Sequence, residues 1–397
     1  MSKMICYVGN WWESDKGFWV KGGTSTIGIC ACEYNEGTGE LTPFARFHED
    51  ICVGMQCIDN ERNVLYAADE KLADPAFVRG GGGYVYAFKI DPATGNLTML
   101  NKVPSFGTLT SYVMLDPKGR FLVATNHSCH NFVTKIVKNK DYGEFERKVL
   151  FDDATTVLYE LNDDGSIGKA CDVYCAMGGG GPLEQQTLSH PHSANFAPLG
   201  DFFVMCDKGG DLVHTLRIDR ENKKLVLCDE PFLTERGMMP RYSAFHPTKP
   251  FVYTNNEAQP VLHCFRYTPD GKLSLIGTCP GIAEDVPYDG TPHTVMQSDL
   301  VVGQDGKYLY SLVRKVNVIS VYSIDQETGE LAMIDCKRLT AQDPHSCCFS
   351  PDGRFLLVGA MKSGKVFTYP VLPDGKLGDA VASVDQPSAC CMTFKKL

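Results

Sequence analysis

The chain is built from short apolar runs separated by polar turns, and the order of these runs repeats. Each unit has a short apolar segment, a turn of the Pro-x-Gly kind, a second apolar run, a polar turn and a strand with alternating apolar and polar positions. Clear copies occupy residues 114–126, 195–207, 244–256, 300–312 and 348–360, and residues 57–69 form a copy with a weaker turn. Regular self-similarity of this kind is typical of a repeat architecture.

The alternating strand of each unit leads into a hairpin. Segments 85–100, 213–227, 262–276 and 319–334 place a turn between two alternating runs, and three of these turns contain Asp-Gly or Thr-Gly. Glycine accepts the positive φ that tight hairpin turns require, so these dipeptides are strong hairpin signals. No segment has a helical period long enough to cover a sheet, and the pattern therefore predicts an all-β chain.

Four strands per unit with regular turns predict the blades of a β-propeller. The apolar strand of the repeat occurs seven times, so we expect seven four-stranded blades in a single domain, residues 1–397. Two β-sandwiches would not account for the repeat. The first copy lacks its leading segment, whereas residues 387–394 resemble a leading segment with nothing after it. We expect the N- and C-terminal strands to close one blade, with the C-terminal strand innermost, because this removes exposed sheet edges.

The spacing between copies is widest at about residues 128–156, where charged and aromatic residues mix without a clear period. This excess predicts an insertion between two strands of the third blade. We expect the insertion to lie over one face of the disc.

Composition narrows the class of partner and the compartment. A formal net charge of −10 argues against a surface built for nucleic acid or anionic membrane, so we expect a small-molecule partner, anionic or sugar-like, held by a few local arginines. The first residues lack a signal-peptide core, and no window reaches membrane-spanning length. Seventeen cysteines, many inside apolar strands, indicate buried free thiols rather than a disulfide scaffold, and predict a reduced, cytoplasmic protein.

The loops that lead into the innermost strands of a propeller converge on one mouth of its central channel. In this chain a proline recurs at these places, and it is followed by His192, Arg241 or His345. Proline fixes the local backbone, so the next residue can be aimed at the channel axis. A purely structural position would favour small or apolar residues, so the polar and charged set indicates a site. His190 precedes the same turn as His192.

The ends of the second strands reach the same mouth. Asn126, Glu257 and Arg314 lie at or next to such ends, and we expect Asn126, like His190, His345 and Arg314, to contact a substrate.

With these residues the sequence resembles the seven-bladed propeller lactonases, which include propeller-type 6-phosphogluconolactonases and fungal 3-carboxy-cis,cis-muconate lactonizing enzymes. The resemblance covers nearly the whole chain, and its most specific parts are "HPHSANFAPLGDFFVMCDKGGD" (190–211), "PRYSAFHPTKPFVYTNNE" (240–257) and "SDLVVGQDGKYLYSLVR" (298–314). It implies that His192, Arg241, Glu257 and Arg314 are active-site residues.

The sequence departs from that family at two places near the expected mouth. The last blade usually begins Pro-Arg and carries an asparagine after its second strand, whereas this chain has His345 and Ala360-Met361. In the third blade, "NHSCHN" (126–131) replaces an Asn-Tyr followed by a glycine turn. These departures predict a substrate pocket unlike that of the known members.

The residue types suit the opening of a lactone by water. This reaction needs a base for the water, positive charge for the oxyanion, and an acid for the departing oxygen. A neutral His192 fits the base, Glu257 orients it or carries the proton itself, and Arg241 and Arg314 supply fixed positive charge. No bound cofactor is needed. Two alternatives share these residues: a cycloisomerase that closes an unsaturated carboxylic acid, and a non-catalytic propeller that binds a partner.

A metal centre is the weaker interpretation. His127, Cys129 and His130 have spacings that can bind a metal, but the sequence offers no second cluster to complete a site. We therefore expect no metal.

Overall fold

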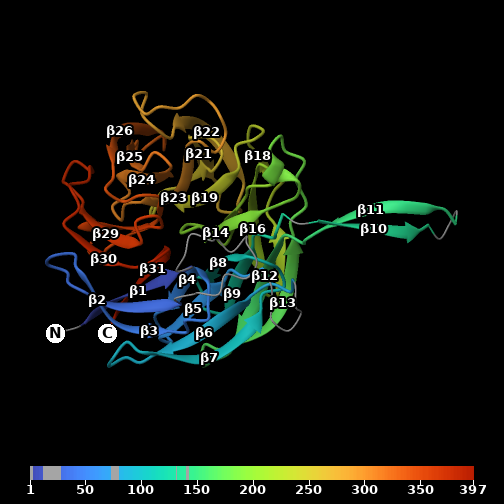
Figure 1. Cartoon of the computed structure of the whole chain (residues 1–397), viewed down its shortest axis with the longest axis horizontal. Helices are drawn as coiled ribbons and strands as arrows, with labels where there is room; N and C mark the ends of the chain where they lie inside the picture. Colours follow the sequence, from blue (N-terminus) through green and yellow to red (C-terminus); the bar gives the residue numbers. More distant parts are fainter. Residues whose placement is uncertain (1–2, 12–27, 73–79, 131, 140–142) are drawn as a thin grey trace.

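The computed structural model describes residues 3–11, 28–72, 80–130, 132–139 and 143–397. It confirms the all-β, seven-bladed propeller: seven antiparallel sheets of four main strands are arranged around one axis (Figure 1). A single 3-10 turn, Glu184–Gln186, lies outside the sheets in this part of the chain.

The first three blades are made as follows, each from the innermost strand outward. The closing blade holds β31 (Ala389–Lys396), β1 (Met4–Asn10), β2 (Ile29–Tyr34) and β3 (Leu41–Phe47). The second holds β4 (Val53–Asp59), β5 (Val64–Asp69), β6 (Tyr84–Ile90) and β7 (Leu97–Pro104). The third holds β8 (Thr110–Leu115), β9 (Phe121–Asn126), β12 (Thr155–Leu161) and β13 (Ile167–Cys175).

The other four blades have the same order. The fourth holds β14 (Pro191–Phe196), β15 (Phe203–Asp207), β16 (Leu212–Asp219), β17 (Lys224–Leu227) and the short β18 (Phe232–Leu233). The fifth holds β19 (Pro240–Phe245), β20 (Phe251–Asn256), β21 (Val261–Tyr267) and β22 (Leu273–Pro280). The sixth holds β23 (Met296–Val302), β24 (Tyr308–Arg314), β25 (Val318–Ile324) and β26 (Leu331–Arg338). The seventh holds β27 (Pro344–Phe349), β28 (Phe355–Ala360), β29 (Lys365–Pro370) and β30 (Ala382–Asp385).

The two ends of the chain close one blade, as the sequence predicts. Strand β31 is innermost and pairs antiparallel with β1, from Met4 opposite Lys396 to Asn10 opposite Ala389. Each innermost strand contacts the next around the ring, including β31 with both β27 and β4. The ring is therefore continuous, and the neighbouring blades protect the inner edge of each sheet.

The core lies between neighbouring blades rather than inside any one of them. One apolar cluster joins Ile5 and Tyr7 of the first blade to Leu65 and Phe88 of the second. The hairpin glycines seen in the sequence take part in the same interfaces. The hydroxyl of Tyr310 in β24 donates to the carbonyl of Gly375 in the next blade at 2.6 Å, and Gly375 has a φ of +83°. Tyr7, Tyr66 and Tyr253 make equivalent bonds to Gly95, Gly165 and Gly329.

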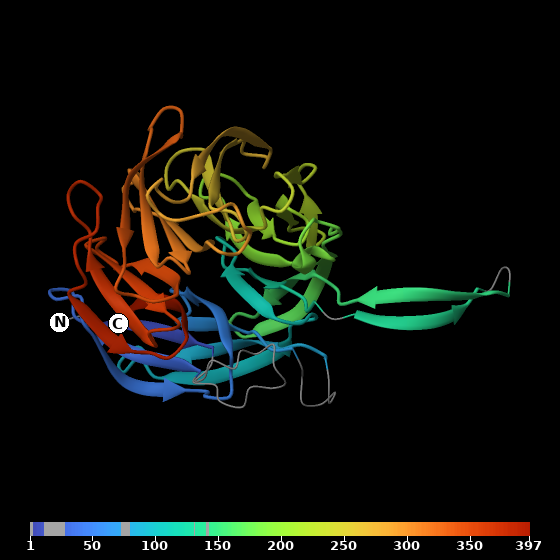
Figure 2. The ribbon, with the colours of Figure 1, turned by 45° about the horizontal axis from the view of Figure 1, so that its top comes forward.

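The insertion in the third blade forms a two-stranded hairpin, β10 (Phe132–Lys138) and β11 (Phe145–Phe151), between β9 and β12. Our expectation that it lies over a face of the disc is wrong: both views show the hairpin extending away from the disc (Figures 1 and 2). Many of its apolar side chains are exposed, including Phe145 at 76%. It therefore adds nothing to the blade interfaces and does not cover the channel.

All seventeen cysteines are free thiols, as the sequence predicts. Burial raises the pKa of several of them, for example that of Cys57 to about 12. Among the described residues, no helix has the length and apolar character needed to cross a membrane.

Candidate active site

A β-bulge in every innermost strand explains how the candidate residues reach the channel. Near the start of each strand the pairing with its neighbour skips one residue in five blades and two in the other two. The first skipped residues are Gly54, Ser111, His192, Arg241, Ser298 and His345, and the closing blade skips Cys390. A bulged residue leaves the ladder, which turns its side chain to a new direction. Three of the predicted site residues thus occupy equivalent bulges.

A second set of side chains comes from the end of each second strand. In six blades it is the residue that follows the last paired residue, and in β24 it is the last paired residue itself, Arg314. In those six blades the backbone N–H of this residue donates to the carbonyl of the residue just before the innermost strand. Glu257, for example, donates to Met239 at 2.8 Å, and Lys208 donates to His190 at 3.1 Å. Trp11, Glu70, His127, Lys208, Glu257, Arg314 and Met361 occupy this place around the ring. The two sets together line one mouth of the channel.

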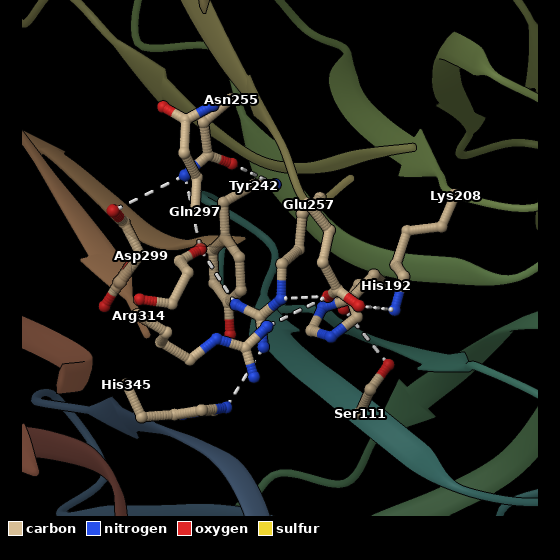
Figure 3. Close-up of polar contacts among 12 residues, drawn as sticks. Ser111, His192, Lys208, Tyr242, Asn255, Glu257, Gln297, Asp299, Arg314 and His345 are labelled. Atoms are coloured by element: carbon tan, nitrogen blue, oxygen red, sulfur yellow. Dashed lines mark hydrogen bonds and ion pairs between the residues drawn. The ribbon is translucent and has the colours of Figure 1, made fainter. Parts of the chain in front are cut away.

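The centre of the site is a carboxylate held by three cations (Figure 3). Glu257 accepts from Lys208 Nζ at 2.9 Å through Oε1 and from Arg241 Nε at 2.7 Å through Oε2. Arg314 Nη2 lies 3.4 Å from the same Oε2. Burial alone would raise the pKa of Glu257, but Lys208, Arg314 and Arg241 outweigh it and hold that pKa well below its usual range. Glu257 is therefore ionised and bonded to cations.

This cluster carries more positive than negative charge. Lys208, Arg241 and Arg314 are balanced by the single carboxylate of Glu257, which leaves about two positive charges if all four are ionised. Burial raises the pKa of the nearby Glu70 to about 8, so it adds little negative charge at neutral pH. A chain with a net charge of −10 thus presents a local site for an anion.

Arg241 and Arg314 differ in how far their hydrogen bonds are already used. Arg241 donates to Glu257, to the carbonyl of Ser298 at 2.8 Å and to His345 Nε2 at 3.0 Å. His345 therefore acts as an acceptor that fixes the Arg241 guanidinium. In Arg314 the Nε and Nη2 atoms have no hydrogen-bond acceptor among the described residues. Arg314 is the better placed of the two to grip an added carboxylate or phosphate.

His192 lies beside this cluster with its ring between two aromatic neighbours. Its ring centroid is 5.3 Å from that of Tyr242 and 5.5 Å from that of His127, and its carbonyl accepts from Ser111 at 3.1 Å. The Nδ1 atom is buried and has no partner among the described residues. Burial, followed by Arg241 and Lys208, lowers the pKa of His192 well below its ordinary value, so the imidazole is neutral. A neutral imidazole has one nitrogen lone pair, which can accept a proton.

Two other sequence-predicted residues are placed differently from this core. Asn126 is buried, and its amide accepts from Thr110 and donates to Ser105 and Thr155, each at 2.8 Å. Its amide is therefore used in contacts around the third blade, and a substrate contact of Asn126 stays a prediction. His190 is buried next to His127 and His130, with ring centroids 4.7 Å and 4.1 Å away.

Lys208 is the member of this candidate site that sequence reasoning missed. It follows Asp207 as Glu257 follows Asn256, so aligning the second-strand ends of the repeats would have found it. The opposite end of the channel has a different character. A cavity of about 490 Å³ opens there, lined by side chains such as Asn195, Phe245 and Phe349 and by no member of the Glu257 cluster.

Comparisons with known proteins agree with the propeller fold. The 6-phosphogluconolactonase of Bacillus subtilis is 25% identical over 397 aligned residues, which cover 99% of each chain. That of Formosa agariphila is 24% identical over 86% of this chain and 88% of its own. Among solved structures, a periplasmic gluconolactonase of Pseudomonas aeruginosa superposes with a TM-score of 0.78 at 20% identity over 99% of each chain, which shows the shared fold. The model of the family described as lactonase, 7-bladed beta-propeller, matches residues 18–394, and the chain belongs to that family.

Proposed function

We propose that this protein is a lactone hydrolase that opens a sugar-derived lactone with water at the mouth formed by His192, Arg241, Glu257 and Arg314. Family membership and the names of the relatives support the reaction class. The observation that carries the proposal is that the neutral imidazole of His192 lies beside a buried cluster with an excess of positive charge, formed by Lys208, Arg241, Glu257 and Arg314. Lactone opening requires both features, a base for water and positive charge for an oxyanion.

His192 serves as the general base. It takes a proton from water as the water oxygen forms a bond to the lactone carbonyl carbon. The carbonyl oxygen becomes an oxyanion, which the positive charge of Arg241 and Arg314 stabilises. When the oxyanion collapses, the bond from carbon to ring oxygen breaks, and the protonated His192 returns the proton to that oxygen. The product is the open hydroxy acid, with atoms and charge balanced.

Glu257 plays an electrostatic part in this scheme rather than that of a base. Its carboxylate is already bonded to Lys208 and Arg241, and its low pKa makes it a poor proton acceptor. It fixes the two arginines in place and offsets part of their charge. This assignment favours His192 over Glu257 as the group that receives the first proton.

The substrate is an anionic lactone, and a phosphorylated sugar lactone suits the site well. The Nε and Nη2 atoms of Arg314 make no hydrogen bond in the described part of the chain, although Nη2 lies 3.4 Å from Glu257. They form the edge of a guanidinium that can grip a phosphate or carboxylate in bidentate fashion. The free and largely buried thiols suit a reducing compartment, so we place the activity in the cytoplasm.

The test is a panel of γ- and δ-lactones, with and without a phosphate group, assayed by proton release at neutral pH against the uncatalysed rate. We expect the wild-type protein to favour phosphorylated lactones, and Arg314→Gln to reduce that preference by at least about tenfold. Arg354→Gln is the matched control, because this exposed arginine lies in a surface ion pair with Asp352. If folded wild-type protein releases no proton above the uncatalysed rate from any lactone of the panel, the proposal is overturned. Cyclisation of an unsaturated acid, or a binding role, would then take its place.

A further inference from the structure

Three histidines from two loops meet beside the proposed active site. His127 and His130 come from the loop after β9, and His190 comes from the loop before β14. One ring nitrogen from each lies within 4.8 Å of the other two. The sequence places two of these residues close together, and only the fold brings the third to them.

From this geometry we infer that His127, His130 and His190 form a binding site for one transition-metal dication of the zinc class. Neutral imidazole nitrogens are the ligands that Zn²⁺, Co²⁺ and Ni²⁺ accept readily. A tetrahedral zinc ion with bonds of about 2.1 Å requires nitrogens about 3.4 Å apart. The present spread therefore needs only small rotations of the rings to close. Three protein ligands leave a fourth position open for water or an added ligand.

Hydrogen bonds already select the ring nitrogens that would bind. His190 Nδ1 donates to the carbonyl of His127 at 2.8 Å, which leaves Nε2 with its lone pair. That Nε2 belongs to a fully buried residue and has no partner in the described part of the chain. His127 Nδ1 donates to the carbonyl of Ser128 at 3.0 Å and so also leaves Nε2 as the ligand atom. Metal-binding histidines are commonly held by such bonds from the opposite nitrogen.

The loop that carries His130 is fixed to its surroundings. Ser128 Oγ donates to the carbonyl of Ser189 at 3.1 Å and lies 3.1 Å from His190 Nδ1. The backbone N–H of Cys129 donates to Asp152 at 3.1 Å. These contacts join the two loops, so little ordering is left for the metal to impose.

Lys208 is the main opposing group. Its Nζ lies 3.4 Å from His127 Nε2, and an ammonium there repels a dication. The same ammonium lies closer to Glu257, at 2.9 Å, and that carboxylate offsets its charge. At His190 the carboxylates of Asp207 and Glu257 also oppose the effect of Lys208 on the pKa of the imidazole. Metal binding would leave Lys208 on Glu257 alone. Lys208→Met is therefore expected to bind the metal several-fold more tightly than the wild type.

The experiment is a titration of the EDTA-treated full chain with cobalt(II) chloride, followed by visible absorption and by calorimetry. Low-symmetry Co²⁺ with nitrogen ligands gives intense visible bands, and thiolate ligands add a near-ultraviolet band that reveals binding to cysteine instead. We expect one Co²⁺ per chain, displaced by one Zn²⁺. His130→Ala should weaken binding by at least ~100-fold, more than the loss of a residue that only orients a ligand.

Cys129→Ser is the matched control, because it alters the same loop without removing a histidine, and it should bind like the wild type. His190→Gln is the second ligand variant, and circular dichroism confirms that each variant is folded. Absence of Co²⁺ binding by folded wild-type protein would overturn the inference, as would unchanged binding by both histidine variants. The readout is independent of lactone opening, so metal binding without lactonase activity would refute only the proposed function, and the reverse result only the metal site.

Discussion

Replacing Glu257 with glutamine removes the carboxylate from among Lys208, Arg241 and Arg314 while keeping the shape of the side chain. The Glu257 and Lys208 side chains are 10% and 9% exposed, and that of Arg241 is 2% exposed. Removing one partner of a buried ion pair costs about 3–5 kcal/mol, because the other charge stays uncompensated, whereas an exposed pair contributes about 0–1 kcal/mol. Glutamine keeps one acceptor oxygen, so we expect Glu257→Gln to lower the free energy of unfolding by about 3 kcal/mol.

The assay is equilibrium unfolding in urea followed by circular dichroism, in which the midpoint should fall while the slope with urea stays the same. Asp379→Asn is the control, because Asp379 pairs with Lys337 but is 99% exposed, and it should change the midpoint little. The double variant Lys208→Met/Glu257→Gln should recover part of the loss, since it removes one of the unbalanced cations. A change below about 0.5 kcal/mol in Glu257→Gln, the size of an ordinary surface substitution, would refute the charge balance described here.

Three further regions give direct predictions. Tyr310→Phe should lower the free energy of unfolding by about 1 kcal/mol, because it loses one buried hydrogen bond. Gly375→Ala should lower it by about 2–3 kcal/mol, because the φ of Gly375 is +83° and a Cβ would lie 2.5 Å from the Tyr308 ring. Thermal unfolding checks both variants. Replacing residues 132–151 with a short linker should leave lactone opening within about twofold of wild type, since no hairpin residue that the structure describes belongs to a core cluster. A large loss of rate in folded protein would contradict the separation of the hairpin from the site. Burial raises the pKa of Glu70 to about 8, so the neutral acid favours folding, and the free energy of unfolding should fall as pH rises from about 4.5 through 8. Glu70→Gln should lose this fall. Unfolding midpoints of the wild type that stay the same across that range would show that Glu70 titrates normally.

The fold was largely predictable because its signals are local and repeated. Each hairpin glycine and each Pro-x-Gly turn specifies its own connection, and seven similar units need one another to bury their apolar faces. The unpaired ends of the repeat then indicate the closure between β1 and β31. The direction of the β10–β11 hairpin was not predictable, since exposed apolar residues such as Phe145 have no partner in the sequence pattern that would show where they point.

The site was predictable only in part. The proline before His192, Arg241 and His345 marks a turn, but the bulge that aims these side chains depends on the register between two strands, which a single sequence does not state. Lys208 escaped notice because its role comes from the neighbouring blade, through Glu257. The meeting of His190 with His127 and His130 is likewise a product of the distance between two blades rather than of sequence spacing.

The most direct test of the account is the rate of proton release from the preferred lactone by His192→Ala compared with the wild type. Removal of a general base typically costs about 10²–10⁴-fold, so we predict a fall in kcat of that size with an unfolding midpoint close to that of the wild type. Unchanged kcat in folded His192→Ala would contradict the assignment of this mouth as the place where the lactone is opened.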